Sequence, residues 1–165
     1  MDLSFQVMDE ASARKTLTWR YEPPYDFYNP NPEKAKETIQ WFLDLRNAYY
    51  AITGEAGELV GYCCFGADAR VSGGDYSTDA LDIGLGMRPD LTGQGRGGDF
   101  FATVVAFARR TFGPQALRVT VAAFNRRAIR VYEKAGFERV QVFQRSSDRV
   151  EFVILMTSSD VKCAR

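Results

Sequence analysis

The chain has 165 residues, with 21 basic and 21 acidic side chains and no histidine. The balanced charge argues against a protein that binds nucleic acid mainly by electrostatics, and the lack of imidazole excludes Ser-His-Asp and Cys-His catalysis. The length fits a single domain over residues 1–165 with a core of its own.

Two adjacent cysteines, Cys63 and Cys64, lie in the apolar run GYCCFG. They are typical of small core residues in a reduced protein, so we expect a cytoplasmic location. Without histidine or CxxC spacing, we expect no metal site. The N-terminus lacks a signal-peptide pattern, and no apolar run approaches the ~20 residues that span a bilayer, so no membrane partner is expected.

The first half of the chain alternates between strands, helices and loops. A strand is predicted over residues 3–8, a helix capped by Asp9 over 10–19, a loop over 20–32 and a helix over 33–45. A hairpin of strands 48–53 and 58–66 follows, then a polar, glycine-rich loop over 68–77 and a strand over 79–87.

The second half begins with a glycine-rich loop and an amphipathic helix over residues 99–112. A strand over 116–122 follows, then a helix over 126–135 with Asn125 as N-cap and Gly136 after its end. The final strands are predicted over 137–143 and 149–156. The strand-helix-strand crossover over 79–122 predicts a parallel pair within a mixed α/β (α+β) fold whose hairpins add antiparallel pairs.

Two surface features each allow two interpretations. The segment RYEPPYDFYNPNP at 20–32 combines prolines with aromatic residues, which suits a binding surface or a hydrophobic lid folded onto the core. The arginines Arg126, Arg127 and Arg130 form either a local basic patch or a solvated helix face.

The glycine-rich loop predicts an anion site with phosphate as the expected ligand. Its residues are Thr92, Gly93, Gln94, Gly95, Arg96, Gly97 and Gly98. Glycines let successive amides turn toward one point, and the following helix start adds free amides and a positive dipole end. The loop lacks the Gly-Lys-Ser/Thr of a nucleotide P-loop, and it lies in mid-chain, unlike the first turn of a dinucleotide-binding fold.

Two motifs at a matching separation resemble the GNAT acyltransferases. The stretch from Met87 to Gly97 is similar to their acetyl-CoA-binding motif, and Asn125-x-x-Ala128-x-x-x-Tyr132-x-x-x-Gly136-Phe137 is similar to their downstream motif. The resemblance implies a mostly antiparallel, seven-stranded sheet with a central parallel pair, about four flanking helices, and acetyl-CoA as cosubstrate without a metal. Thr92 departs from the motif, which has arginine or glutamine there.

The resemblance also implies roles for individual residues. Backbone groups of Leu85 and Met87 would pair with the pantetheine arm, and the loop from Thr92 to Gly98 would hold the pyrophosphate. Asn125 would hydrogen-bond the cofactor near the pantetheine, and a backbone amide near Met87 would stabilise the oxygen of the tetrahedral intermediate. Tyr132 would sit by the thioester sulfur and donate a proton to the leaving thiolate, and a core aromatic residue on this helix is the alternative.

The acceptor side rests on side chains of other segments. Without histidine, the base that deprotonates the amine is a carboxylate or a water chain. Asp82 is our candidate because a charge inside a strand needs a reason, although a salt-bridged or solvent-facing Asp82 is the alternative. Other carboxylates that could serve are Glu55, Glu58, Asp75 and Asp79. Aromatic residues that would line the acceptor pocket are Tyr21, Tyr25, Phe27 and Tyr28.

We therefore expect an N-acetyltransferase that moves an acetyl group from acetyl-CoA to a primary amine by direct attack in a ternary complex. The acceptor would be a small molecule or a peptide. A non-catalytic acyl-CoA-binding sensor on the same fold and an unrelated nucleotide-binding α/β protein are the alternatives. The late strands over 137–156 offer an edge through which a homodimer could pair.

Overall fold

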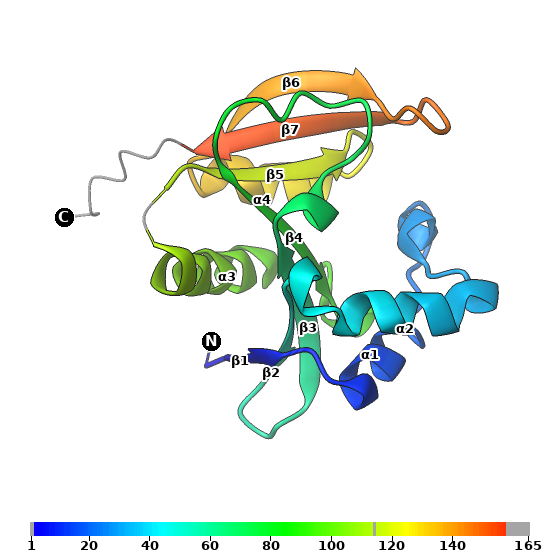
Figure 1. The fold of residues 1–165 in the computed structure, drawn as a ribbon. Coiled ribbons are helices and arrows are strands. Elements are labelled where there is room, and N and C mark those ends of the chain that lie inside the picture. Colours follow the sequence, from blue (N-terminus) through cyan, green and yellow to red (C-terminus); the bar gives the residue numbers. More distant parts are fainter. Residues whose placement is uncertain (1, 114, 158–165) are drawn as a thin grey trace.

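The fold is built on one sheet of seven strands in the order β1-β2-β3-β4-β5-β7-β6 (Figure 1). The computed structural model describes residues 2–113 and 115–157. The strands are β1 Ser4–Val7, β2 Tyr49–Thr53, β3 Leu59–Phe65, β4 Leu81–Met87, β5 Leu117–Ala122, β6 Glu138–Gln144 and β7 Glu151–Thr157. Only β4 and β5 pair in parallel, and the other neighbours are antiparallel. The mixed sheet with a central parallel pair is therefore confirmed.

Within the same residues, the helices lie on both faces of this sheet (Figure 1). The α-helices are α1 Glu10–Thr16, α2 Ala35–Leu43, α3 Gly97–Phe112 and α4 Arg126–Lys134, and the short 3-10 helices are η1 Tyr25–Tyr28, η2 Pro32–Lys34, η3 Leu45–Asn47, η4 Ala67–Ala69 and η5 Pro89–Leu91. The apolar stripe of α3 and residues of α4 share the main core cluster with the central strands. Residues of α1 and α2 form a second cluster on the opposite face.

Cys63 and Cys64 show how strand periodicity divides the core. Neighbouring residues of a strand face opposite sides of the sheet, and Cys63 joins the α3 cluster while Cys64 joins the α1–α2 cluster. Burial raises the pKa of both thiols, that of Cys64 to about 12. Both are therefore buried core thiols, as expected.

The element boundaries differ from the sequence prediction at three helices. α1 ends at Thr16, before the expected end at residue 19. The helix expected over 33–45 is divided, because the Asp44 backbone is extended (φ −70°, ψ 114°) and its side chain caps η3. α3 begins at Gly97, two residues before the expected start, so two residues of the glycine-rich run lie in its first turn.

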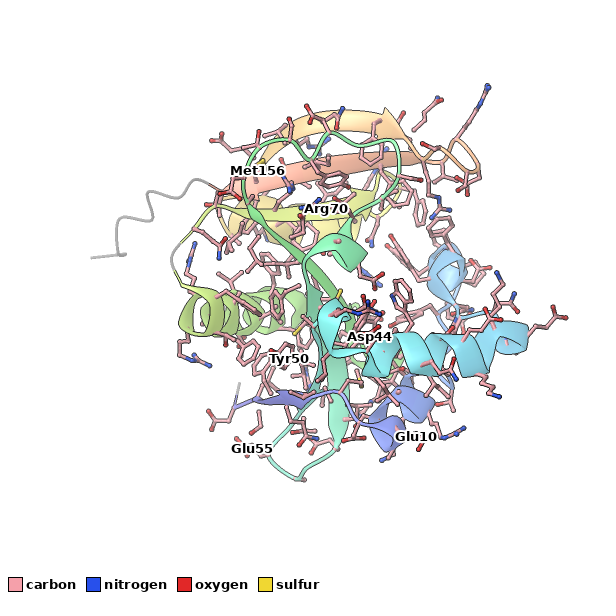
Figure 2. All side chains as sticks on the ribbon, viewed as in Figure 1. Glu10, Asp44, Tyr50, Glu55, Arg70 and Met156 are labelled. Atoms are coloured by element: carbon pink, nitrogen blue, oxygen red, sulfur yellow. The ribbon has the colours of Figure 1, made fainter. Side chains whose placement is uncertain are left out.

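The loop between η4 and β4 covers the face of the sheet opposite α3 and α4 (Figure 1). Val71 and Tyr76 of this loop pack against a third cluster that includes Phe143 and Phe152. On the α3 face, Tyr50 packs against Phe107 of α3 with ring centroids 5.0 Å apart and lies between strand and helix in Figure 2. The central strands are thus covered on both faces.

Gly61 of β3 sets how closely α3 approaches the sheet. A Cβ at this position would lie 2.6 Å from the Phe100 ring and 2.7 Å from the backbone oxygen of Gly86. The backbone oxygen belongs to the neighbouring strand, so it cannot move away as the end of a flexible side chain can.

We predict that Gly61→Ala lowers the free energy of unfolding by roughly 1–3 kcal/mol, as overpacking of a tight core does. Gly54→Ala is the matched control, because its added methyl would meet only the carboxylate end of Glu58. Urea denaturation measures both variants. Equal free energies of unfolding for Gly61→Ala and Gly54→Ala would contradict the role of Gly61 in the close approach of α3.

Candidate functional site

The site begins where β4 and β5 part in the middle of the sheet. The strands pair only at Leu81, Asp82 and Ile83 of β4, which lie beside residues 117–119 of β5. Beyond these pairs, β4 continues alongside β3 and β5 continues alongside β7 (Figure 1). The rest of β4 has no strand on its β5 side.

The backbone groups of Leu85 and Met87 point into this gap. The Asp82 carbonyl accepts from Gly66 and the Arg88 amide donates to Val60, so the even-numbered residues of β4 face β3. Because backbone groups alternate along a strand, the odd-numbered residues face the other side. These are the two residues expected to pair with a pantetheine arm.

Tyr21 reaches the same gap from the loop after α1. Its hydroxyl donates a hydrogen bond of 2.7 Å to the Met87 carbonyl. Burial raises the pKa of Tyr21 to about 12, so the hydroxyl keeps its proton at ordinary pH. The Met87 carbonyl is thus satisfied by an acceptor-side residue, while the Met87 amide on the same edge of β4 points to the gap.

The glycine-rich loop follows β4 and leads directly into α3. Gly93 (φ 71°) and Gly95 (φ 75°) adopt left-handed backbone conformations that favour glycine. No side chain caps the start of α3, so the amides of its first turn stay open to an anion. This arrangement suits the phosphate site that the sequence predicts.

Two polar side chains of the loop stabilise its turns. The Thr92 hydroxyl donates to the Pro89 carbonyl at 2.6 Å, and the Gln94 amide donates to the Asp90 carbonyl at 2.6 Å. Both hydrogen bonds are internal to the stretch 89–94. These two side chains therefore hold the backbone whose amides are predicted from the sequence to bind an anion.

Asn125 and Tyr132 belong to the start and the middle of α4. The Asn125 side chain accepts from the Ala128 amide at 3.1 Å, which confirms it as the N-cap. Its amide nitrogen also donates to the Tyr28 hydroxyl at 3.2 Å. Tyr132 is 7% exposed and packs on Phe101 with ring centroids 4.7 Å apart. Burial, and secondarily the nearby Tyr28, raises the Tyr132 pKa.

The aromatic residues of η1 pack on the second half of the chain. Phe27 lies edge-on to Phe124 at 5.3 Å and close to Phe152 at 6.3 Å between ring centroids. The Arg145 guanidinium lies 5.1 Å from the centre of the Phe27 ring. Phe27 and Tyr28 nevertheless remain 36% and 40% exposed. The segment is folded back as a lid, and it still offers aromatic surface.

Residues 21–28 therefore cross the gap from one side to the other. Tyr21 contacts the end of β4, and Tyr28 contacts Asn125 at the β5–α4 junction. The structure brings these residues together with the gap, as expected for a segment beside an acceptor site.

Asp82 has partners that argue against its use as a base. The carboxylate is 1% exposed, and Arg118 donates to both of its oxygens at 2.6 and 2.8 Å. Arg70, labelled in Figure 2, adds a third bond of 2.8 Å. Both oxygens of the carboxylate are thus engaged by guanidinium groups, and almost none of its surface is open to an amine. These contacts favour the salt-bridged alternative for Asp82 over a role as the base that deprotonates the amine.

The other carboxylates named from the sequence lie in two separate places. Glu55 and Glu58 line a cavity of about 250 Å³ together with Met87, so they lie near the end of β4. Asp75 and Asp79 lie exposed on the loop over the opposite face. Within residues 2–113 and 115–157, no cluster of His, Cys, Asp or Glu side chains could hold a metal ion, and no helix is long and apolar enough to cross a membrane.

Tyr62 of β3 is a site residue that the sequence did not indicate. Its ring covers Gly86 of β4, where a Cβ would lie 2.6 Å from the ring. It also stacks near Trp19 at 6.3 Å between centroids, and burial raises its pKa. An aromatic residue opposite a glycine on the neighbouring strand could have pointed to Tyr62. This pairing is visible only once the strand register is known, and the sequence does not give the register.

The profile of the acetyltransferase (GNAT) domain matches residues 4–138 of the sequence. The chain belongs to this family. Its fold is similar to that of the aminoglycoside acetyltransferase AAC(6')-Ib in complex with ribostamycin and coenzyme A, with a TM-score of 0.76, 16% identity and coverage of 100% of this chain and 99% of that chain. No curated protein matches the sequence.

Two further solved structures share the GNAT fold. A spermidine N-acetyltransferase SpeG chimera from Vibrio cholerae and hSSAT has a TM-score of 0.74 and 14% identity, with 96% of each chain covered. The putative acetyltransferase yncA from Salmonella typhimurium, with its cofactor acetyl-CoA, has a TM-score of 0.61 and 15% identity, with 98% of this chain and 96% of that chain covered. At these identities the likeness establishes the fold.

We predict that Asp82→Asn destabilises this acetyltransferase by roughly 3–5 kcal/mol, because the buried Arg118 guanidinium would lose its ionic partner. Glu10→Gln is the matched control, since its pair with Arg14 is exposed, with side chains 64% and 60% accessible, and should cost less than about 1 kcal/mol. Chemical denaturation compares the two. An Asp82→Asn protein as stable as the control would restore Asp82 as a candidate base.

Proposed function

We propose that this acetyltransferase is an N-acetyltransferase that uses acetyl-CoA and a primary amine on a small molecule or peptide. The observation that carries the proposal is the parting of β4 and β5, which leaves the backbone groups of Leu85 and the Met87 amide without a strand partner beside the glycine-rich loop. Coenzyme A has partners for both groups. The amides of its pantetheine arm can hydrogen-bond the β4 edge, and its diphosphate can accept from the loop amides. The coenzyme A and acetyl-CoA bound in the similar structures support this assignment.

Different residues of the chain bind different parts of coenzyme A. The odd-numbered edge of β4 pairs with the pantetheine amides, and the amides from Gly93 to Gly98 hold the diphosphate. Asn125, which already caps α4, lies beside the pantetheine near Tyr28. The side chains of Thr92, Gln94 and Arg96 shape the loop around these amides.

The chemical step is a direct attack on the thioester. The amine nitrogen forms a bond to the carbonyl carbon, and its proton leaves to a water chain from the open side of the gap. The amide of Met87 stabilises the negative oxygen of the intermediate. When the carbon–sulfur bond breaks, the Tyr132 hydroxyl donates its proton to the sulfur. The proton taken from the amine returns to Tyr132 through the water chain, and the products are the acetylated amine and free coenzyme A.

The acceptor approaches between the segment 21–28 and the end of β4. Tyr21, Tyr25, Phe27 and Tyr28 supply aromatic surface that suits an aliphatic or cationic amine. The aminoglycoside and spermidine named in the similar structures are both amines. A non-catalytic acyl-CoA sensor would bind the same cofactor but would release no thiol with any amine.

We predict that Tyr132→Phe lowers kcat for thiol release roughly 100-fold while leaving the KM for acetyl-CoA nearly unchanged, because the lost hydroxyl acts on the leaving sulfur. Acetyl-CoA and a panel of primary amines form the assay. Tyr50→Phe, which alters a ring packed on Phe107 away from the gap, is the control. Tight coenzyme A binding without turnover on any amine would favour the sensor.

The raised pKa of Tyr132 gives a second prediction. Burial moves this pKa above its ordinary value of 10.0, so the acid stays protonated throughout neutral and mildly alkaline solution. We expect kcat to rise as the amine deprotonates and to show no descending limb between about pH 6 and about pH 10. A pH profile at saturating acetyl-CoA tests this. A fall in kcat near neutral pH would rule out Tyr132 as the proton donor.

A further inference from the structure

Arg127 is an exposed guanidinium in the first turn of α4. None of the ion pairs in residues 2–113 and 115–157 includes it. The first turn of α4 also contains Arg126 and no acidic residue. Positive charge is unfavourable at the positive end of a helix dipole, so an anion that binds here would remove this conflict.

The guanidinium of Arg127 lies against the glycine-rich loop. A Cβ built on Gly93 would lie 3.1 Å from its Nη1 atom, and Gly93 has a left-handed backbone. From α4, Arg127 therefore contacts this loop with a charged group, whereas Val131 contacts it at Gly97 with an apolar side chain. Loop and helix come from separate parts of the chain, so the sequence alone does not show this contact.

The loop's own polar side chains are engaged elsewhere. Thr92 and Gln94 hydrogen-bond backbone carbonyls of the preceding turn. Arg96 lies near Asp90, whose pKa is lowered mainly by a hydrogen bond from Arg88 and to a smaller extent by the charge of Arg96. Arg127 contacts the loop at Gly93, and it takes part in none of the ion pairs of the described residues 2–113 and 115–157.

Tyr25 of η1 holds the guanidinium in this place. The central carbon of the Arg127 guanidinium lies 4.1 Å from the centre of the Tyr25 ring. A ring stacked on the flat face of a guanidinium leaves the N–H donors at its edge free to bind an anion. The stack therefore orients Arg127 without occupying its donors.

We propose that Arg127 is the cationic side chain that binds the coenzyme A diphosphate, in place of the family's arginine or glutamine at the position of Thr92, and that Tyr25 is its positioning residue. This inference rests on the proposed function, because it takes coenzyme A as the ligand. It gives Tyr25, expected from the sequence to line the acceptor pocket, a role in cofactor affinity.

The first test measures binding of three probes by isothermal titration calorimetry: coenzyme A, dephospho-coenzyme A, which keeps the diphosphate but lacks the 3'-phosphate, and pantetheine, which lacks both. In Arg127→Gln we expect roughly tenfold weaker binding or more for the first two probes, as for loss of a charge-assisted hydrogen bond, and no change for pantetheine. Arg130→Gln, an exposed arginine on the same helix, is the matched control and should bind all three as wild type does.

Several outcomes of this test would overturn the proposal. Unchanged coenzyme A binding in Arg127→Gln would do so, as would a loss equal to that of Arg130→Gln, which would indicate a general charge effect. A loss for coenzyme A without a loss for dephospho-coenzyme A would place Arg127 at the 3'-phosphate instead. If the wild-type protein bound no coenzyme A, the proposed function itself would fail, which is a distinguishable result.

The second test concerns the positioning role of Tyr25. We expect Tyr25→Leu to weaken coenzyme A binding severalfold and Tyr25→Phe, which keeps the stacked ring, to restore it. Circular dichroism melting checks that both variants fold. If Tyr25→Leu bound coenzyme A as wild type does and raised only the KM for the amine, the positioning role would be wrong.

Discussion

The parting of β4 from β5 is the constraint on which the site depends. At the closed end, three residue pairs join the strands, and the buried Asp82–Arg118 ion pair joins their side chains on one face. A pair buried this fully costs much to desolvate, so its net contribution to stability can be small. Its geometry nevertheless fixes the register of β4 and β5, and with it the point at which they separate.

The open end creates unmet hydrogen-bonding capacity in the middle of a sheet. Buried backbone groups are nearly always paired, and the gap leaves those of Leu85 and Met87 without a strand partner. The Tyr21 hydroxyl satisfies the Met87 carbonyl. A ligand with alternating amide groups is the natural partner for the rest of this edge. α3 and α4 both begin after the carboxyl ends of the parallel strands, which is where ligands commonly bind in such sheets.

Much of this could be predicted from the sequence because the signals are local. Asn125 at a helix start and the glycines of 93–98 before an apolar stripe are motifs that local chemistry enforces. The role of Asp82 could not be predicted in this way. Its partner Arg118 lies 36 positions away, and a strand carboxylate suits a base or an ion pair equally until the register is known. The path of residues 21–28 could not be predicted from the sequence either, since a loop rich in prolines has no periodic pattern.

The contacts of residues 21–28 also link the binding of the cofactor to the binding of the amine. Tyr28 shares a hydrogen bond with Asn125, and Tyr25 stacks on Arg127, so two residues of η1 contact the first turn of α4. A ligand that orders α4 and its neighbouring loop therefore also orders η1. By thermodynamic reciprocity, a ligand that orders η1 also orders α4. In a direct-attack mechanism this coupling is useful, because a cofactor that fixes α4 also fixes the aromatic surface that the amine must cross. In the proposed mechanism, the gap, the glycine-rich loop and the lid would act as one binding unit whose parts come from four separate stretches of the chain.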